Sequence, residues 1–138
     1  MHSFRQAVET HDAAAIEATL ADDVVFTSPV AFKPYPGKAI TAAILRGVLR
    51  VFEDFRYVRE IVDANGRDAA LVFEATVGGK HVNGCDFVHL NEQGKVDELT
   101  VMVRPLSAAT ALSEAMGAQF EQIRREAAEQ IQRETAGA

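Results

Sequence analysis

The sequence contains little that would support a disulfide framework, a membrane span or a nucleic-acid interface. A single cysteine, Cys85, excludes an intramolecular disulfide and favours a reducing compartment. No run reaches the roughly 18 apolar residues of a membrane span, and residues 1–12 lack the pattern of a signal peptide. The 14 basic residues nowhere cluster, and 20 acidic ones give a net charge of −6, which would repel phosphate backbones. We expect a cytoplasmic protein with no membrane partner and no nucleic-acid partner.

The composition is that of a soluble globular domain. Hydrophobic residues make up 48% and charged residues 25% of the chain. At 138 residues the chain suits one domain, 1–138, and no linker, repeat or low-complexity segment divides it.

Apolar periodicity predicts helices at both ends of the chain and in its first half. Residues 3–10 and 13–21 read as two short helices, the second capped by Asp12, and residues 38–52 as a longer amphipathic helix. An alanine-rich helix is predicted over 107–133. The sequence becomes highly charged beyond Gln122, so its last turns are expected to be solvated or to lie against a partner chain.

The remaining segments have the alternation of strands. Residues 24–30 (VVFTSPV) place Val24, Phe26 and Ser28 on one face. Three reversals, at Asn65-Gly66, Gly78-Gly79 and residues 91–94, then predict a four-stranded antiparallel meander. Its first strand, near 56–64, needs a bulge, because a regular register would turn Arg56 and Glu60 inward.

The turns fix which residues share a face of the meander. With Val77 opposite Lys80, Asp86 lies opposite Leu71, and with Leu90 opposite Lys95 it also lies opposite Leu99. The inner face then collects Leu71, Phe73, Ala75, Val82, Asp86, Val88, Leu99, Val101 and Val103. The outer face collects Val72, Glu74, Asn83, Cys85, Phe87, His89, Thr100 and Met102, and its apolar part would suit a homodimer contact.

Several segments together resemble the nuclear transport factor 2-like superfamily, and small SnoaL-like proteins in particular. They are DDVVFTSPV, PYPGKAI, VFEDF, GCDFVHLNEQGKV and MVRPLSA. The resemblance covers about residues 3–117 and implies an α+β fold. In that fold a cone-shaped, curved antiparallel sheet packs on three N-terminal helices around an apolar pocket, often in a dimer. Residues 118–138 would extend a long C-terminal helix.

The related ketosteroid isomerases allow a comparison of individual positions. Asp86 occupies the position of their oxyanion-hole acid. Ser28 stands where the resemblance expects the general-base aspartate, and Phe4 is the nearest match to their first-helix tyrosine. In the limonene epoxide hydrolases an acid is expected where this chain has Val101. Neither mechanism is therefore expected here.

Asp86 is the candidate catalytic residue, because parity places its carboxyl among apolar side chains. An isolated carboxylate there must either find hydrogen-bond donors or keep its proton. It would act on a ligand as acid, base or hydrogen-bond donor; the alternative is a structural aspartate bonded to backbone, Ser28 or Tyr35. Ser28 lacks a histidine partner and is expected to be a polar pocket group rather than a nucleophile. The candidate ligand-binding residues, which could equally be core, are Ser28, Tyr35, Phe26, Phe32, Phe52, Phe55, Phe73, Leu71, Val88, Leu99 and Val101.

No cofactor or metal site is predicted. His81, Cys85 and His89 share a face, but successive members would lie roughly 13 Å apart along a strand, too far to share one ion. The leading interpretation is a pocket protein for a small hydrophobic metabolite, with cofactor-free isomerase, cyclase or hydratase chemistry at Asp86. A non-catalytic ligand-binding domain and a dimerisation scaffold with a filled core remain the alternatives.

Overall fold

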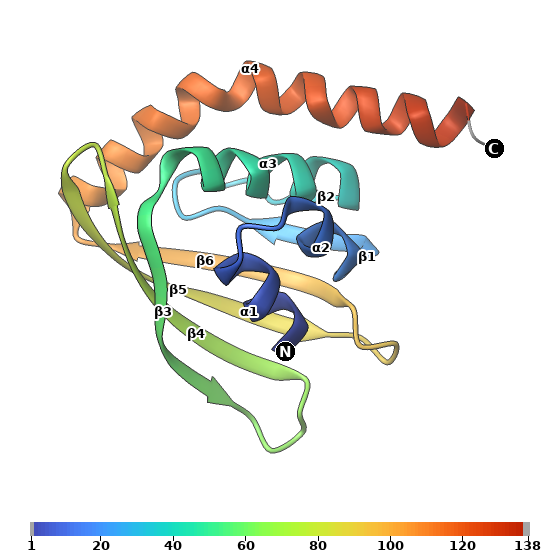
Figure 1. Cartoon of the computed structure of the whole chain (residues 1–138), viewed down its shortest axis with the longest axis horizontal. Coiled ribbons are helices and arrows are strands. Elements are labelled where there is room, and N and C mark those ends of the chain that lie inside the picture. Colours follow the sequence, from blue (N-terminus) through green and yellow to red (C-terminus); the bar gives the residue numbers. More distant parts are fainter. Residues whose placement is uncertain (1, 137–138) are drawn as a thin grey trace.

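A computed structural model describes residues 2–136 as one α+β unit in which a curved sheet is covered on its concave side by helices (Figure 1). The helices are α1 (His2–Glu9), α2 (Ala13–Ala18), α3 (Lys38–Val51) and α4 (Leu106–Ala136). The strands are β1 (Leu20–Thr27), β2 (Tyr35–Pro36), β3 (Glu53–Val62), β4 (Asp68–Val77), β5 (Lys80–Leu90) and β6 (Val96–Arg104). None of the described helices is long and apolar enough to cross a membrane.

The sheet has the order β2-β1-β6-β5-β4-β3, so the predicted meander β3 to β6 is confirmed. The sheet is mixed rather than wholly antiparallel, because β1 adds to β6 in parallel. A parallel neighbour requires a long crossover, which α3 and the strands that follow it supply.

The predicted turns set the β4–β5 register. Gly78 and Gly79 have φ values of 54° and 79°, and Val77 pairs with Lys80 as expected for a two-residue turn. Leu71 therefore lies opposite Asp86. The reversal at Asn65-Gly66 is also present, although regular pairing ends at Val62 and Ala69.

The β5–β6 register differs from the prediction by two residues. Leu90 pairs with Val96 rather than Lys95, and a bulge at Asp97 shifts the register once more, so that Asp86 faces Val101 and not Leu99. Two shifts of one residue cancel in parity, and the inner and outer faces therefore stay as predicted.

The bulge expected in β3 is present, and neither Arg56 nor Glu60 is buried. The register shifts between Glu53 and Arg56 and again between Tyr57 and Arg59. Arg56 turns to the outer face, where it pairs with Glu74 at 3.1 Å. Glu60 stays on the side of Leu71, but at the sheet edge its carboxylate meets Arg5 of α1 at 3.3 Å. The residue that reaches the interior is Tyr57.

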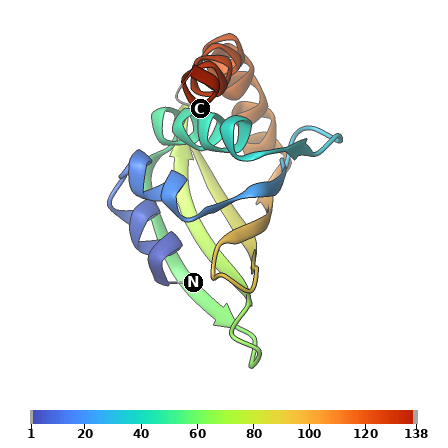
Figure 2. The same ribbon diagram turned by 90° about the vertical axis from the view of Figure 1, so that its right-hand side faces the viewer.

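The long helix α4 packs on its own chain throughout most of its length. It rises from the end of β6, crosses the open side of the sheet and then runs along α3 (Figures 1 and 2). Ile123 and Ala127 are buried against α3, and Arg46 pairs with Glu126 at 2.8 Å. Residues 131–136 at the end of the helix are exposed, in agreement with the expectation for its last turns.

Candidate active site

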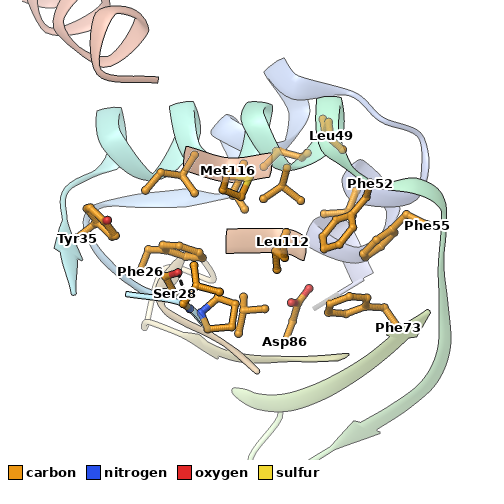
Figure 3. A pocket seen from close by; sticks show the side chains of 18 of the residues that line it. Phe26, Ser28, Tyr35, Leu49, Phe52, Phe55, Phe73, Asp86, Leu112 and Met116 are labelled. Atoms are coloured by element: carbon orange, nitrogen blue, oxygen red, sulfur yellow. Dashed lines mark hydrogen bonds between the residues drawn. The ribbon is translucent and has the colours of Figure 1, made fainter. Parts of the chain in front are cut away.

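The concave face of the sheet and the helices above it enclose a cavity of about 250 Å³. Its walls are mainly apolar, and the labelled side chains converge on it from α3, α4, strands β1 to β5 and the segments that connect them (Figure 3). A completely filled core, which the scaffold hypothesis requires, is therefore not observed. Of the predicted ligand-binding residues, those that line the cavity are Phe26, Ser28, Tyr35, Phe52, Phe55, Phe73 and Val101.

Four predicted ligand-binding residues lie elsewhere. Leu71, Val88 and Leu99 are at most 2% exposed but fill the core beneath the cavity. Phe32 is 98% exposed, because the proline-rich loop turns it toward solvent while Tyr35 from the same loop turns inward. Tyr35 contacts the rings of Phe26 and Phe120, with centroids 6.4 and 5.9 Å away.

Asp86 projects from β5 into the cavity beside Phe73 (Figure 3). Its Oδ2 accepts a hydrogen bond of 2.6 Å from the hydroxyl of Tyr57. Among residues 2–136 no other side chain or backbone group bonds to the carboxyl, so Oδ1 is left for a ligand. The alternative in which backbone, Ser28 or Tyr35 satisfies Asp86 is wrong: the partner is Tyr57.

Burial raises the pKa of Asp86 to about 7, although the hydrogen bond from Tyr57 acts in the opposite direction. A carboxylate loses much hydration energy in such a place, and one neutral donor returns only part of it. Burial and the adjacent charge of Asp86 also raise the pKa of Tyr57 well above 10. Tyr57 is therefore the permanent donor of the pair, and Asp86 is the member that exchanges a proton near neutrality.

Tyr57 owes its position to the β3 irregularity. Asp54 has a φ of 53°, a conformation that aspartate tolerates better than most residues, and it lies inside the first register shift. Phe55 and Tyr57 then both point inward, with their rings in edge contact at 5.0 Å. The guanidinium of Arg5 lies 5.7 Å from the centre of the Tyr57 ring. The sequence pattern of residues 56–64 predicted a bulge in this strand but not its exact position.

The helices supply cavity walls that sequence reasoning did not assign to the site. These residues are Phe4 and Val8 of α1, Ile44, Leu45, Val48 and Leu49 of α3, and Leu112, Met116 and Phe120 of α4. Their helical spacing predicted buried faces but could not distinguish packed contacts from cavity lining.

Among the described residues that line the cavity, few are polar and none is a Lys or Arg. Ser28 lines it, with its Oγ accepting a hydrogen bond of 3.1 Å from the backbone N–H of Val30. His11, an exposed residue in the turn after α1 with a φ of 55°, also lines it. Ser113 contributes a hydroxyl from α4. The arrangement can accommodate a neutral apolar body and present the Asp86–Tyr57 pair to one oxygen atom.

Comparisons with known proteins agree with this architecture. The SnoaL-like domain family matches residues 1–99, which include both Tyr57 and Asp86 but not α4. No protein of curated function matches the chain.

Among solved structures, a steroid delta-isomerase from Pseudomonas aeruginosa is 37% identical, with a TM-score of 0.83 and 88% of each chain covered. An uncharacterised protein with a cystatin-like fold from Silicibacter pomeroyi DSS-3 is 34% identical, with a TM-score of 0.80 over 91% of this chain and 92% of the other. A protein described as a polyketide cyclase, from Pseudomonas putida KT2440, shares the fold at 21% identity and a TM-score of 0.65, covering 78% of this chain and 90% of the other. The chain therefore belongs to the SnoaL-like domain family, within the nuclear transport factor 2-like and ketosteroid isomerase-related superfamily.

Proposed function

We propose that this protein takes up a small, neutral, largely apolar compound and moves a proton on it without a cofactor, using Asp86 as acid and base. The reaction class is isomerisation, cyclisation or hydration next to a carbonyl or hydroxyl group. The observation that carries the proposal is the buried carboxyl of Asp86, bonded by Tyr57 on one oxygen and free on the other, at the wall of an apolar cavity.

The charge of the cavity wall favours a neutral ligand. Because no Lys or Arg lines the described cavity, an anionic ligand would find no counter-charge and would meet Asp86 when that residue is ionised. A carbonyl oxygen can instead accept a hydrogen bond from protonated Asp86, and Tyr57 keeps the carboxyl in place.

The pKa of Asp86 suits proton transfer. A group with a pKa of about 7 is present in both protonation states at neutral pH, so it can donate a proton and take one back in the same reaction cycle. Such a step needs no electron acceptor, since only a proton changes position.

The cavity volume favours a ligand smaller than a steroid nucleus. About 250 Å³ lies below the roughly 300–1,000 Å³ typical of pockets for drug-sized molecules. A compound of one or two rings fits within it. The similarity to the steroid delta-isomerase from Pseudomonas aeruginosa supports an isomerase reaction for this protein. However, Ser28 stands in the position where the resemblance expects the general base.

The second candidate is a binding protein without turnover. It is favoured by the lack of any second carboxylate or amine among the residues that line the cavity. In that case Asp86 would only hold a ligand oxygen.

One experiment separates the two. A bicyclic unsaturated ketone is incubated with the protein in D₂O, and exchange of the protons next to the carbonyl is followed by NMR, while binding is measured by calorimetry. Proton transfer predicts exchange that Asp86→Asn abolishes and that Asp22→Asn, an exposed acid-to-amide control on β1, leaves unchanged. Binding without exchange in the unmodified protein supports the second candidate. Neither binding nor exchange across a panel of such ketones and the matching alcohols contradicts both.

We also propose that two copies associate through the outer face of the sheet. Phe87 and Met102 are 44% and 58% exposed there, and Val72, Cys85, His89 and Thr100 surround them. Large apolar side chains gathered on one face of a sheet are typical of an interaction surface.

A further inference from the structure

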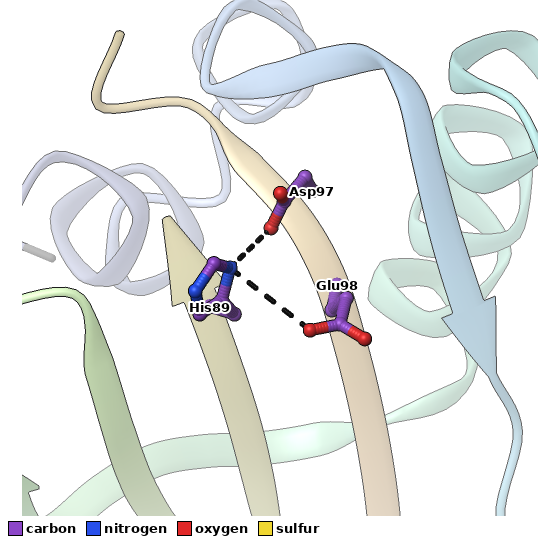
Figure 4. Close-up of side chains that lie close together, drawn as sticks. All are labelled: His89, Asp97 and Glu98. Atoms are coloured by element: carbon purple, nitrogen blue, oxygen red, sulfur yellow. Dashed lines mark hydrogen bonds and ion pairs between the residues drawn. The ribbon is translucent and has the colours of Figure 1, made fainter. Parts of the chain in front are cut away.

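A histidine and two carboxylates meet on the outer face of the sheet, remote from the cavity (Figure 4). Nδ1 of His89 lies 2.6 Å from Oδ1 of Asp97 and 3.9 Å from Oε2 of Glu98. One ligand atom from each of the three residues lies within 4.8 Å of the others. The cluster is a feature of two neighbouring strands, β5 and β6, and not of a mobile loop.

The β-bulge in β6 is what brings the two acids together. Regular alternation would send consecutive residues to opposite faces, yet Asp97 and Glu98 both lie outside, between the buried Val96 and Leu99. His89 pairs directly with Glu98, and Asp97 is the extra residue of the bulge. Bulges commonly redirect a side chain toward a functional site.

A third carboxylate, that of Asp68, stands on the other side of the imidazole. Oδ1 of Asp68, on the neighbouring strand β4, lies 4.0 Å from Nε2 of His89, with which it pairs in register. The amide of Asn65 donates a hydrogen bond of 2.8 Å to the other oxygen of Asp68. Histidine ligands of metals usually donate their second ring N–H to a carboxylate, which orients the ring. Asp68 stands on that side of the ring, although 4.0 Å is longer than a hydrogen bond.

We propose that His89, Asp97 and Glu98 form a binding site for a divalent metal ion of the Zn²⁺ type. The imidazole favours Zn²⁺ and its transition-metal neighbours over Mg²⁺ and Ca²⁺, which prefer sites made of oxygen alone. Asp68 faces the other ring nitrogen at 4.0 Å, where its charge favours a cation bound to the imidazole. The ion replaces the proton that Nδ1 otherwise shares with Asp97.

The dimensions agree with this assignment. Ligands at about 2.0–2.2 Å from a tetrahedral ion lie roughly 3.3 Å from one another. The two distances from Nδ1, 2.6 and 3.9 Å, lie on either side of that value, so small side-chain rotations are sufficient. The Glu98 side chain is 71% exposed, which leaves the ion open to water or to a group from another molecule.

The proposed site uses residues from two neighbouring strands, whereas His81, Cys85 and His89 on β5 alone are too far apart to share one ion. His81 and Cys85 lie nearer the start of β5, and His81 makes its own contact with Glu74 at 3.4 Å. His81 therefore provides a matched control: a histidine on the same strand and face, beside one acid, outside the cluster.

The test is calorimetric titration of the folded full-length protein with ZnCl₂ and, separately, with MgCl₂. The proposal predicts one Zn²⁺ per chain and no comparable Mg²⁺ binding. His89→Ala and Asp97→Asn should each weaken Zn²⁺ binding at least tenfold, and Asp68→Asn should weaken it less, because Asp68 acts only through its charge. His81→Ala should leave the affinity unchanged. Circular dichroism confirms that each variant is folded, and His89→Gln replaces His89→Ala if the latter is not.

Two results would overturn the proposal. One is a titration of the unmodified protein with no saturable Zn²⁺ site. The other is a Zn²⁺ affinity that His89→Ala and Asp97→Asn do not change, which would mean adventitious binding elsewhere on an acidic protein. In either case the cluster is a surface ion pair only.

Discussion

The hydroxyl of Tyr57 on β3 donates a 2.6 Å hydrogen bond to Oδ2 of Asp86 on β5, across the intervening strand β4. Both residues pair with β4, Tyr57 with Phe73 and Asp86 with Leu71, so the sheet itself fixes their separation. The carboxyl is held by one donor in an apolar wall. Its proton affinity therefore depends on a small number of identifiable contacts.

The free energy of unfolding should depend on pH through Asp86. The pKa rises from an ordinary 3.8 to about 7 on folding, so the folded state binds the extra proton between these values. Stability therefore decreases as the pH rises through this window, and above it the ionised group costs about 4 kcal/mol. Relative to Asp86→Asn, the unmodified protein should lose stability by up to this amount between about pH 4 and pH 9, measured by urea unfolding.

The control for this effect is Asp22→Asn, which removes an exposed carboxyl from β1. Its stability should follow that of the unmodified protein at every pH. Parallel pH profiles for Asp86→Asn and the unmodified protein would contradict a raised pKa at Asp86. Titration of the Asp86 carboxyl by ¹³C NMR gives the same quantity directly.

Removal of the Tyr57 hydroxyl should raise the pKa of Asp86 further. The hydrogen bond from Tyr57 favours the ionised form, so in Tyr57→Phe the midpoint of the Asp86 titration moves above about 7. Stability should fall by about 1–3 kcal/mol above the midpoint, where a buried carboxylate loses its only donor, and by less below it. An unchanged midpoint would mean that Tyr57 and Asp86 do not share a hydrogen bond in solution.

Much of the sheet could be predicted because turns and alternation depend on local sequence. The diglycine turn fixed the β4–β5 register, and Asp86 lies opposite Leu71 for that reason. The β5–β6 pairing was displaced by two residues, yet parity survived because the loop and the Asp97 bulge each contributed one residue. Face assignments are thus more robust than individual pairings.

The site was less predictable because its geometry depends on irregularities. Tyr57 reaches Asp86 only through the bulges in β3, and Asp97 joins Glu98 only through the bulge in β6. A bulge can be expected where alternation fails, but its position follows from packing across the sheet. Phe32 shows the same limit, since an aromatic residue in a proline-rich loop can point to either side.

Gly84 should be intolerant of any side chain, because the Phe73 ring lies over it. A Cβ at this position would overlap Cζ of Phe73. Gly84→Ala should therefore cost about 1–3 kcal/mol and push Phe73 into the cavity. Gly117→Ala is the control: its Cβ meets nothing within 4 Å, and alanine favours helix, so stability should stay equal or increase. The double variant Gly84→Ala/Phe73→Leu should recover part of the loss, and thermal unfolding measures all four proteins.

If two copies associate through the outer face of the sheet, the protein should sediment as a dimer, and a charge introduced on that face should dissociate it. The unmodified protein should behave in sedimentation as twice its 15.0 kDa chain, and Met102→Glu should shift it toward the single chain. Ile131→Glu places the same charge on α4, where Ile131 is 55% exposed, and should leave the mass unchanged. A monomer in the unmodified protein at micromolar concentration would contradict the proposal.

The end of α4 should contribute to stability through Ile123. This side chain is fully buried and lies where Gly47 of α3 leaves room for it: a Cβ on Gly47 would come within 2.8 Å of Ile123 Cδ1. Ile123→Ala should lower the free energy of unfolding by about 2–5 kcal/mol. Ile131→Ala, further along the same helix and exposed, should change it by less than about 0.5 kcal/mol. Equal effects of the two substitutions would mean that the helix beyond Phe120 does not pack on α3. Because Met116 and Phe120 line the cavity from the same helix, ligand affinity in Ile123→Ala should also fall if α4 holds the cavity closed.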